Sequence, residues 1–304
     1  MGIRYIEHYF FIMSVASALG AGTVINAIAT LQGAAFGIDL RTYAEVTRRE
    51  SGILCEIRDD PTANTSLIYE CAQLVLARSN LDVGLHIRTR SEVPIASGLK
   101  SSSAAANATV LAALDTLDVA IEPIEAVRLG VAAARKSGVT ITGAFDDACA
   151  SFFGGLVVTD NGTDELLART EIDSQVVVYV PKAKSYSAQT NVARSRLLAP
   201  WIKVAFDLAR NGEYESAMVL NGLLYCSALG FSPEPILMAL EAGAKGASLS
   251  GTGPSYVALV DKKRARGVAD VWSVLEGSTI FTHTSNIGAR IEKNSFMRSL
   301  FTEQ

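Results

Sequence analysis

The sequence predicts an α+β fold in two domains, on three observations. Strand-like and helix-like segments are mixed along the chain without the strict alternation of a doubly wound sheet. The 304 residues are enough for two ordinary domains. Apolar residues make up 49% of the chain and charged residues 19%, so there is ample material for a packed core. We therefore expect a folded protein rather than a disordered one.

The first half contains well-marked strands and helices. The expected elements, in chain order, are a strand at Ala34–Arg48, a helix at Asn64–Arg78, a strand at Val83–Thr89, and helices at Ser102–Leu117 and Pro123–Lys136. Asn64 or Thr65 is placed to cap the first of these helices. Pro123 stands at the first turn of the last one, where its missing N–H costs nothing.

The second half begins after a break in the pattern. Asp160–Glu165 is polar and contains Asn-Gly, so it is the predicted junction between domains at 1–160 and 166–304. The expected elements around and after it are a strand at Leu156–Thr159, a strand at Val176–Val180, helices up to Ala242, a strand–turn–strand at Ala247–Val260, a helix at Arg264–Leu275 and a strand at Thr279–Thr284.

An uncharged run from Tyr9 to Leu31 is long enough to cross a bilayer. A signal peptide is a second possibility, since Arg4 precedes the run. Several glycines and polar residues interrupt it, which favours a strand, a glycine turn and a buried helix. We therefore expect no membrane partner.

Charge and cysteine usage narrow the functional classes. The net charge of −4 argues against a nucleic-acid partner, because such proteins usually carry a basic surplus. The four cysteines show no CxxC spacing and no His-rich neighbourhood, so thiolate–metal and redox sites have little support. Isolated cysteines of this kind are typical of a cytoplasmic protein with reduced thiols.

The strongest chemical signal is a small-residue segment between a strand and a helix. The predicted phosphate-binding residues are Pro94, Ile95, Ala96, Ser97, Gly98, Leu99, Lys100, Ser101, Ser102, Ser103 and Ala104. Glycine lets backbone amides approach a ligand closely, and the following helix directs free amides and its positive dipole end at that ligand. Serine hydroxyls and the Lys100 ammonium add donors. The alternative is a capped helix after a flexible turn.

This segment is not a P-loop, because the spacing G-x-x-x-x-G-K-[ST] occurs nowhere in the chain. Pro94–Ala105 instead resembles the GHMP kinase signature P-x-x-x-G-L-G-S-S-A-A, with Lys100 where the family usually has glycine. Gly246–Ser255 resembles the third motif of that family. Gly20–Ala29 and Gly33–Leu40 resemble the first motif as archaeal shikimate kinases write it. The matches follow the family's order.

The resemblance implies a fold and an activity. The fold has an N-terminal α+β domain with a left-handed βαβ unit and a ferredoxin-like C-terminal domain, with the substrates between them. The activity is transfer of phosphate from ATP, with Mg²⁺, to the 3-hydroxyl of shikimate in aromatic amino-acid biosynthesis. Homoserine kinase, a GHMP kinase of isoprenoid synthesis and a non-catalytic small-molecule sensor remain alternatives. The oligomeric state stays open.

The resemblance also implies roles for individual residues. Asp146 falls where mevalonate-kinase-like members carry the Asp that accepts the hydroxyl proton, and Asp147 is the neighbouring alternative; from the residues alone, the pair is equally well a helix cap. Ser102 takes the metal-side role. The predicted substrate-binding residues are Asn26, Asp39, Gly251 and Gly253. Their structural alternatives are a core amide, a strand-end carboxylate and a tight turn.

Three features depart from the family pattern. No Lys lies between Met1 and Gly98, although mevalonate-type members use one to support the catalytic Asp. The window in which they place a Mg²⁺-binding Glu holds Arg135 and Lys136, which with Lys100 are candidates for charge neutralisation. Residues 1–12 have no counterpart and are expected to be an extension. The expected partners of the shikimate carboxylate are Arg135, Arg194 or Arg196.

Overall fold

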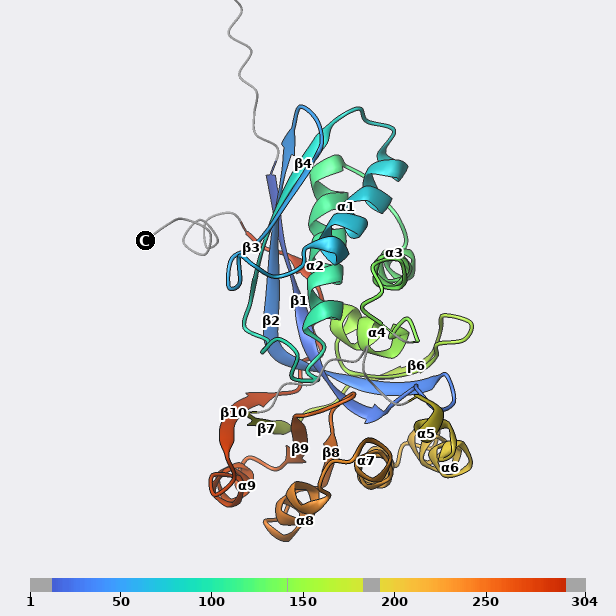
Figure 1. Cartoon of the computed structure of the whole chain (residues 1–304), viewed down its shortest axis with the longest axis vertical. Coiled ribbons are helices and arrows are strands. Elements are labelled where there is room, and N and C mark those ends of the chain that lie inside the picture. Colours follow the sequence, from blue (N-terminus) through green and yellow to red (C-terminus); the bar gives the residue numbers. More distant parts are fainter. Residues whose placement is uncertain (1–12, 141, 183–191, 294–304) are drawn as a thin grey trace, which may run out of the picture.

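The computed structural model describes residues 13–140, 142–182 and 192–293, and residues 1–12 of the expected extension lie outside them. Figure 1 shows two β-sheets following one another along the long axis of the molecule, with helices packed beside each. The first sheet contains β1 (Met13–Ile25), β2 (Gln32–Arg49), β3 (Ile53–Ile57), β4 (Gly84–Ser91), β5 (Leu156–Asp160), β6 (Glu165–Thr170) and β11 (Arg290–Ile291).

Four helices accompany the first sheet. They are α1 (Ser66–Ser79), α2 (Ser101–Leu117), α3 (Pro123–Lys136) and α4 (Phe145–Phe153). The strands β3 and β4 run parallel and are joined by α1, which makes a βαβ unit. One apolar core joins Ala16 and Ala44 of the strands to Ala108 and Ala112 of α2. Small side chains on both sides let this helix lie close to the sheet.

The second sheet has the order β10-β7-β9-β8. Its strands are β7 (Gln175–Pro181), β8 (Gly246–Leu249), β9 (Tyr256–Val260) and β10 (Gly277–His283). Its helices are α5 (Val192–Arg196), α6 (Ala199–Arg210), α7 (Tyr214–Leu229), α8 (Glu234–Glu241) and α9 (Ala265–Trp272). This connectivity is that of the ferredoxin-like βαββαβ arrangement. The predicted α+β fold, with a ferredoxin-like arrangement in the second half, is confirmed.

The predicted elements of both halves correspond to those of the structure to within a few residues. The strands β3, β6 and β11 were not predicted from the sequence. The residues of β6 are mostly exposed, and the strand pairs only with β5. A strand that buries neither face shows no alternation of apolar and polar residues, so its pattern carried no signal.

The prediction for the uncharged run is wrong in one part. The chain continues as a single strand, β1, through Gly20 and Gly22, and no turn or helix interrupts it. These glycines are required by packing, because a Cβ atom on Gly22 would lie 2.4 Å from the ring of Phe36. Asn26 therefore lies in the turn after a strand and not in a buried helix. Every residue of β1 after Met13 is buried, which removes the alternation that marks a half-exposed strand.

The predicted junction at Asp160–Glu165 includes the turn of the β5–β6 hairpin within the first sheet. The chain passes to the second sheet between Thr170 and Gln175, and β11 later returns to pair with β1. The division into domains at 160 and 166 stays a prediction.

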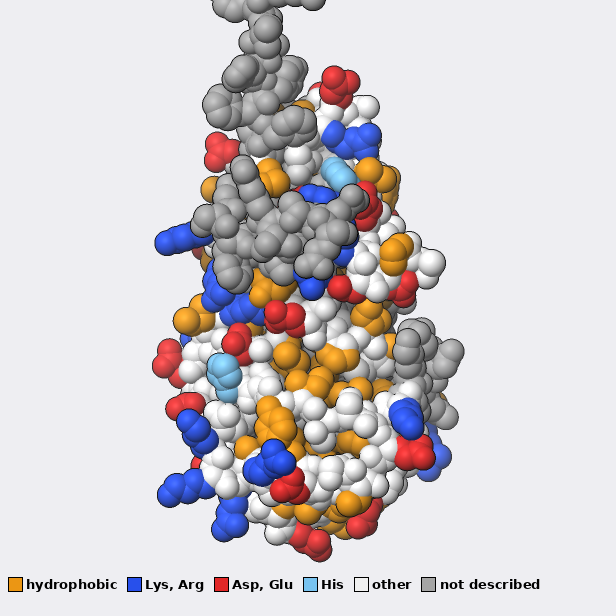
Figure 2. Space-filling model, turned by 90° about the vertical axis from the view of Figure 1, so that its left-hand side faces the viewer, with side chains coloured by type: hydrophobic (Ala, Val, Ile, Leu, Met, Phe, Trp, Pro, Cys, Tyr) orange, Lys and Arg blue, Asp and Glu red, His pale blue; other side chains and the backbone are white. Residues whose placement is uncertain are grey.

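The surface and the helices add two facts about possible partners. On the face drawn in Figure 2, Lys and Arg side chains are interspersed with Asp and Glu side chains. Within the described part of the chain, no helix has the length and apolar character needed to cross a membrane.

Candidate active site

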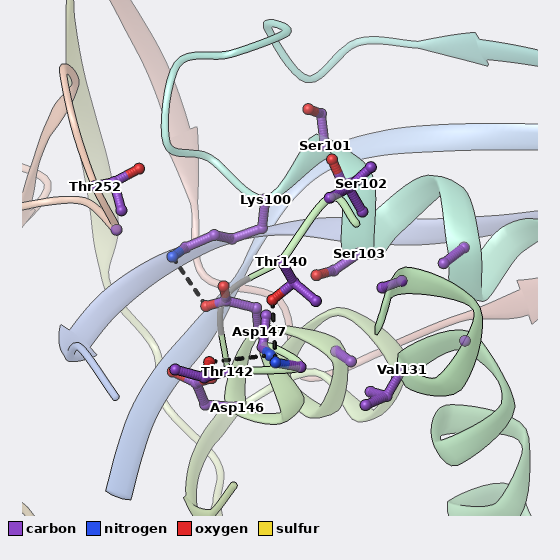
Figure 3. A pocket seen from close by; sticks show the side chains of 18 of the residues that line it. Lys100, Ser101, Ser102, Ser103, Val131, Thr140, Thr142, Asp146, Asp147 and Thr252 are labelled. Carbon is purple, nitrogen blue, oxygen red and sulfur yellow. Dashed lines mark hydrogen bonds and ion pairs between the residues drawn. The ribbon is translucent and has the colours of Figure 1, made fainter. Parts of the chain in front are cut away.

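A cavity of about 450 Å³ brings together segments from both halves of the chain. The loop before α2, the start of α2, part of α3 and the start of α4 form most of its lining, and Gly251 and Thr252 close it from the second half. Figure 3 shows the side chains that face one another across it. The cavity is large enough for a small-molecule ligand.

The loop before α2 has a backbone that few residues adopt. Ala96, Gly98 and Lys100 all have positive φ angles, of 55°, 87° and 67°. This conformation brings the chain directly into α2, so that Ser101, Ser102 and Ser103 form its first turn. The amides of a first turn have no partner within the helix, and together with the helix dipole they attract an anion. The loop is therefore well suited to phosphate.

Hydrogen bonds from two directions fix this loop. The amide of Ala21 in β1 donates to Leu99 O at 3.1 Å. From the second half, Ser250 Oγ donates to Gly98 O at 2.9 Å, and the amide of Ser255 donates to Ser97 O at 3.1 Å. The loop before α2 (residues 94–100, here called the phosphate loop) is thus in direct contact with the glycine-rich loop of the second half (residues 250–255).

Most of the predicted site residues line the cavity. These are Asn26, Ile95, Ala96, Gly98, Lys100, Ser101, Ser102, Ser103, Asp146 and Gly251. Pro94, Ser97, Leu99, Ala104 and Gly253 lie outside the lining. Ser97 Oγ donates to Pro94 O at 2.7 Å, while Leu99 and Ala104 are fully buried, so these residues support the loop from behind. Their ligand contacts stay predictions.

Asp39 lies apart from the other predicted residues. Its side chain is 39% exposed and lies 3.4 Å from Arg41 Nε and 3.5 Å from His283 Nε2. It does not line the cavity. The structure gives it the position of a surface ion-pair carboxylate, and a role in substrate binding stays a prediction.

Asp146 and Asp147 stand in the first turn of α4. Asp146 is 4% exposed, and its carboxylate accepts a hydrogen bond from Asn161 Nδ2 at 2.7 Å. Asn161 Oδ1 in turn accepts from the Asp146 amide and from Thr159 Oγ1. A Cβ atom on Gly33 would lie 2.6 Å from the Asp146 carboxyl carbon, so the neighbouring strand leaves this carboxylate little freedom.

The pKa of Asp146 is raised to about 7, first by burial and second by the negative charge of the neighbouring Asp147. The Lys100 charge and the Asn161 hydrogen bond act in the opposite direction. A carboxyl group with this pKa can accept a proton near neutral pH, which suits a general base.

A pH dependence of the reaction follows from this pKa. The base must be ionised to accept a proton, so kcat/KM should fall about tenfold for each pH unit below about 7 and level off above it. In Asp147→Asn the midpoint should move down, because the charge that raises the pKa of Asp146 is lost. A kcat/KM profile that stays flat from about pH 5 to 8 would contradict this assignment of the base.

Lys100 connects the phosphate loop to the carboxylates. Its Nζ lies 2.9 Å from Asp147 Oδ1, and the two side chains are 9% and 14% exposed. Figure 3 shows the Lys100 side chain extending away from the serines of α2 and ending at the Asp147 carboxylate. The cation and the two carboxylates therefore share one side of the cavity.

Asn26 holds the glycine-rich loop in place. Its Nδ2 donates to Gly251 O at 2.8 Å, and its Oδ1 accepts from the Ile28 amide. Its own amide donates to Asn221 Oδ1 of α7. Both ends of the Asn26 side chain are thus engaged with backbone, which is the structural alternative for this residue; contact with a substrate stays a prediction.

The predicted cations other than Lys100 lie outside the cavity lining. Arg135 forms two hydrogen bonds of 2.7 Å with the carboxylate of Asp164, and Lys136 lies 2.6 Å from Glu70. Arg194 donates to Ser227 O from α5. Of the candidates for charge neutralisation, the structure brings only Lys100 to the carboxylates within the residues it describes.

The donors of the cavity are compatible with Mg²⁺. The described residues contain no group of three or more metal-binding side chains. Mg²⁺ needs no such group, since in kinases it usually binds substrate phosphates and one or two carboxylates and keeps several waters. The hydroxyl of Ser102 and the pair Asp146 and Asp147 line the same cavity.

The sequence predicted no role for Asn161, Thr140 or Thr142. Asn161 lies in the predicted domain junction, although it orients Asp146. Thr140 Oγ1 accepts from the Gly143 amide and Thr142 Oγ1 from the Ala144 amide, which shapes the loop before α4. No local pattern marks such residues, because their partners are decided by the fold.

Comparison with known proteins gives matches in both halves. Residues 66–155 match the family model of the GHMP kinases N terminal domain, and residues 236–274 match that of the GHMP kinases C terminal. The chain is 58% identical over 277 residues to the shikimate kinase of Methanococcoides burtonii, covering 90% of this chain and 96% of that one. It is 54% identical to the shikimate kinase of Methanosarcina mazei, covering 90% and 95%.

Solved structures share the fold at low sequence identity. The mevalonate kinase of Methanococcus jannaschii superposes with a TM-score of 0.73 at 14% identity, covering 91% of this chain and 99% of that one. A homoserine kinase from Cytophaga hutchinsonii gives a TM-score of 0.69 at 15% identity, covering 96% and 100%. At such identities the likeness concerns the fold alone.

Proposed function

The chain belongs to the GHMP kinase family, in its archaeal shikimate kinase branch, and from this premise we propose that it phosphorylates the 3-hydroxyl of shikimate with ATP. The observation that carries the proposal is the cavity itself. It combines a helix N-terminus suited to binding phosphate with a buried carboxylate of raised pKa. Phosphoryl transfer to an alcohol uses the first to position the phosphates and the second to accept the hydroxyl proton. The product is an intermediate of aromatic amino-acid biosynthesis, and we expect the enzyme to act in the cytoplasm.

ATP is bound through its phosphates. The amides and hydroxyls of Ser101, Ser102 and Ser103 hold the phosphate oxygens, and the helix dipole of α2 favours their negative charge. The Ser102 hydroxyl would help to hold Mg²⁺, which would neutralise part of the phosphate charge when bound. Val131 and Ala134 of α3 give the far end of the cavity an apolar wall that suits a nucleoside base.

The transfer step uses Asp146 as the base. The 3-hydroxyl oxygen of shikimate forms a bond to the γ-phosphorus, and the bond from that phosphorus to the β–γ bridging oxygen breaks. The bridging oxygen leaves on ADP with the electron pair, and the hydroxyl proton passes to the Asp146 carboxylate. Asn161 keeps this carboxylate in one orientation.

The shikimate carboxylate needs a cation of its own. A planar carboxylate is bound best by a bidentate guanidinium. The candidates are Arg135, which is paired with Asp164, and Arg194 and Arg196 of α5, of which Arg194 donates to Ser227 O. This short helix packs against α7, which carries Asn221 next to Asn26.

A panel of acceptors tests the proposed function. Purified protein with Mg-ATP should phosphorylate shikimate and should leave homoserine and mevalonate unchanged. A coupled assay for ADP with product identification by mass spectrometry would measure this. Turnover of homoserine alone would overturn the choice of substrate while leaving the kinase fold intact. Absence of turnover with every acceptor would favour the sensor alternative.

A further inference from the structure

Lys100 occupies a position that is unfavourable for its backbone. Its φ angle is 67°, a conformation that non-glycine residues rarely adopt, and it stands directly before the first turn of α2. A glycine would adopt this angle without strain. The lysine therefore holds a backbone conformation in which a glycine would be unstrained.

The side chain crosses the cavity between the two halves of the chain. Nζ lies 2.9 Å from Asp147 Oδ1 on α4. On the opposite side, a Cβ atom added to Gly251 would lie 2.7 Å from the same Nζ. The ammonium thus lies between the carboxylate pair of the first half and the glycine-rich loop of the second, and a side chain at position 251 would require it to move.

Lys100 is also the single Lys or Arg among the described residues that line the cavity. The negative charge in the cavity is large during phosphoryl transfer, because the phosphates and the two carboxylates are all anionic. A buried cation acts more strongly on such charges than an exposed one, because water screens it less. Its side chain is only 9% exposed.

We propose that Lys100 is the catalytic cation of this kinase: its ammonium anchors on Asp147, keeps the neighbouring Asp146 available as the base, and faces the transferring phosphoryl group. The inference rests on the proposed kinase function. It assigns to Lys100 a role in the transition state rather than in holding ATP, since the serines and amides of α2 already provide the phosphate-binding groups.

The expected signature is a loss of kcat without a matching rise in KM. Lys100→Gly and Lys100→Met should lower kcat by about 10²- to 10³-fold, the usual effect of removing one group that stabilises transition-state charge. The KM for ATP should change by less than about tenfold. Lys100→Gly is a favourable variant because it relieves the backbone strain. Lys245→Met, which removes a lysine 2.6 Å from Asp261 outside the cavity, is the control and should keep full activity.

Chemical rescue separates the ammonium from the rest of the side chain. Lys100→Cys should be as impaired as Lys100→Met, and treatment with 2-bromoethylamine should restore activity at least tenfold, because S-aminoethylcysteine carries an ammonium at nearly the length of lysine. Wild-type protein treated in the same way controls for reaction at the four native cysteines. Melting temperatures of all variants check that they are folded.

The outcomes distinguish this inference from the proposed function. If the wild type phosphorylates another alcohol instead of shikimate, the function is wrong, and the Lys100 series is measured on that alcohol. Full kcat in Lys100→Gly, a rise in KM alone, or absence of rescue in folded Lys100→Cys would overturn the role of Lys100 while the function stands. A wild type that phosphorylates no acceptor overturns both.

Discussion

Asp146→Asn is expected to lower kcat by about 10²-fold or more, the usual contribution of a general base. An amide cannot accept the hydroxyl proton, whereas the phosphate loop, which lies on another segment, remains intact. Binding of Mg-ATP measured by calorimetry should therefore stay close to that of the wild type.

Asp147→Asn is the matched variant, one residue away in the same helix turn. It should have the smaller effect on kcat, because Asp147 acts through Lys100 and through the pKa of Asp146 rather than on the proton itself. A larger loss in Asp147→Asn than in Asp146→Asn would exchange the roles of the two carboxylates. Unchanged kcat in both variants would mean that the pair only caps α4.

Asp146→Asn should also stabilise the folded protein at alkaline pH. The ordinary pKa of an Asp side chain is 3.8, whereas that of Asp146 in the folded protein is about 7. Between these values the unfolded chain loses a proton that the folded chain keeps, so folding becomes less favourable as the pH rises, and the cost is complete above about 7. Asn carries no charge at any of these pH values.

Asp146→Asn should therefore unfold at a higher temperature than the wild type at about pH 8. The difference in stability should be on the order of a few kcal/mol, since one pKa unit corresponds to about 1.4 kcal/mol. Near pH 4 the difference should largely disappear. Thermal unfolding of both proteins at the two pH values measures this, and a variant less stable than the wild type at pH 8 would contradict the buried, raised-pKa carboxylate.

Gly98→Ala is expected to reduce kcat/KM for ATP by about 10²-fold or more. A Cβ atom at this position would lie 2.3 Å from Ser250 O and 3.0 Å from Gly253 O. Both are backbone atoms in the glycine-rich loop, so neither can move aside cheaply. The phosphate loop would be displaced from that loop, and displacement of about 1 Å is enough for such a loss.

Gly212→Ala is a close control for the backbone conformation. Gly212 and Gly98 share a φ angle of 87°, but a Cβ atom on Gly212 meets nothing within 4 Å. The control should lose about 1 kcal/mol of stability and no activity. Equal activity of Gly98→Ala and Gly212→Ala in steady-state kinetics would show that contact between the two loops is not required.

Local patterns were sufficient for most of the elements and for singling out the small-residue segment before α2. Glycine, serine and a following helix occur within one short segment at Pro94–Ala105, so their combination is visible in the sequence. Helices such as Pro123–Lys136 show their period and their first-turn proline directly. Three motifs in the right order then identified the family, and the comparisons confirm it.

The alternation of apolar and polar residues failed to indicate a strand where both faces of the strand have the same exposure. The strand β1 is buried on both faces, and its Gly22 is explained by Phe36 on the neighbouring strand rather than by a turn. The exposed strand β6 failed for the opposite reason, since it buries neither face. In both strands the exposure of each face is decided by the elements that pack against it, and the sequence of the strand does not show these elements.

The sequence by itself determined the α+β class, the family and the segments that form the candidate site. The tertiary structure alone decided how these segments meet: Asn161 against Asp146, Lys100 against Asp147, and Asn26 against Gly251, which is 225 residues away. The physical reason is that local propensity acts over a few residues, whereas a site is made by side chains whose separation is fixed only after strands and helices pack.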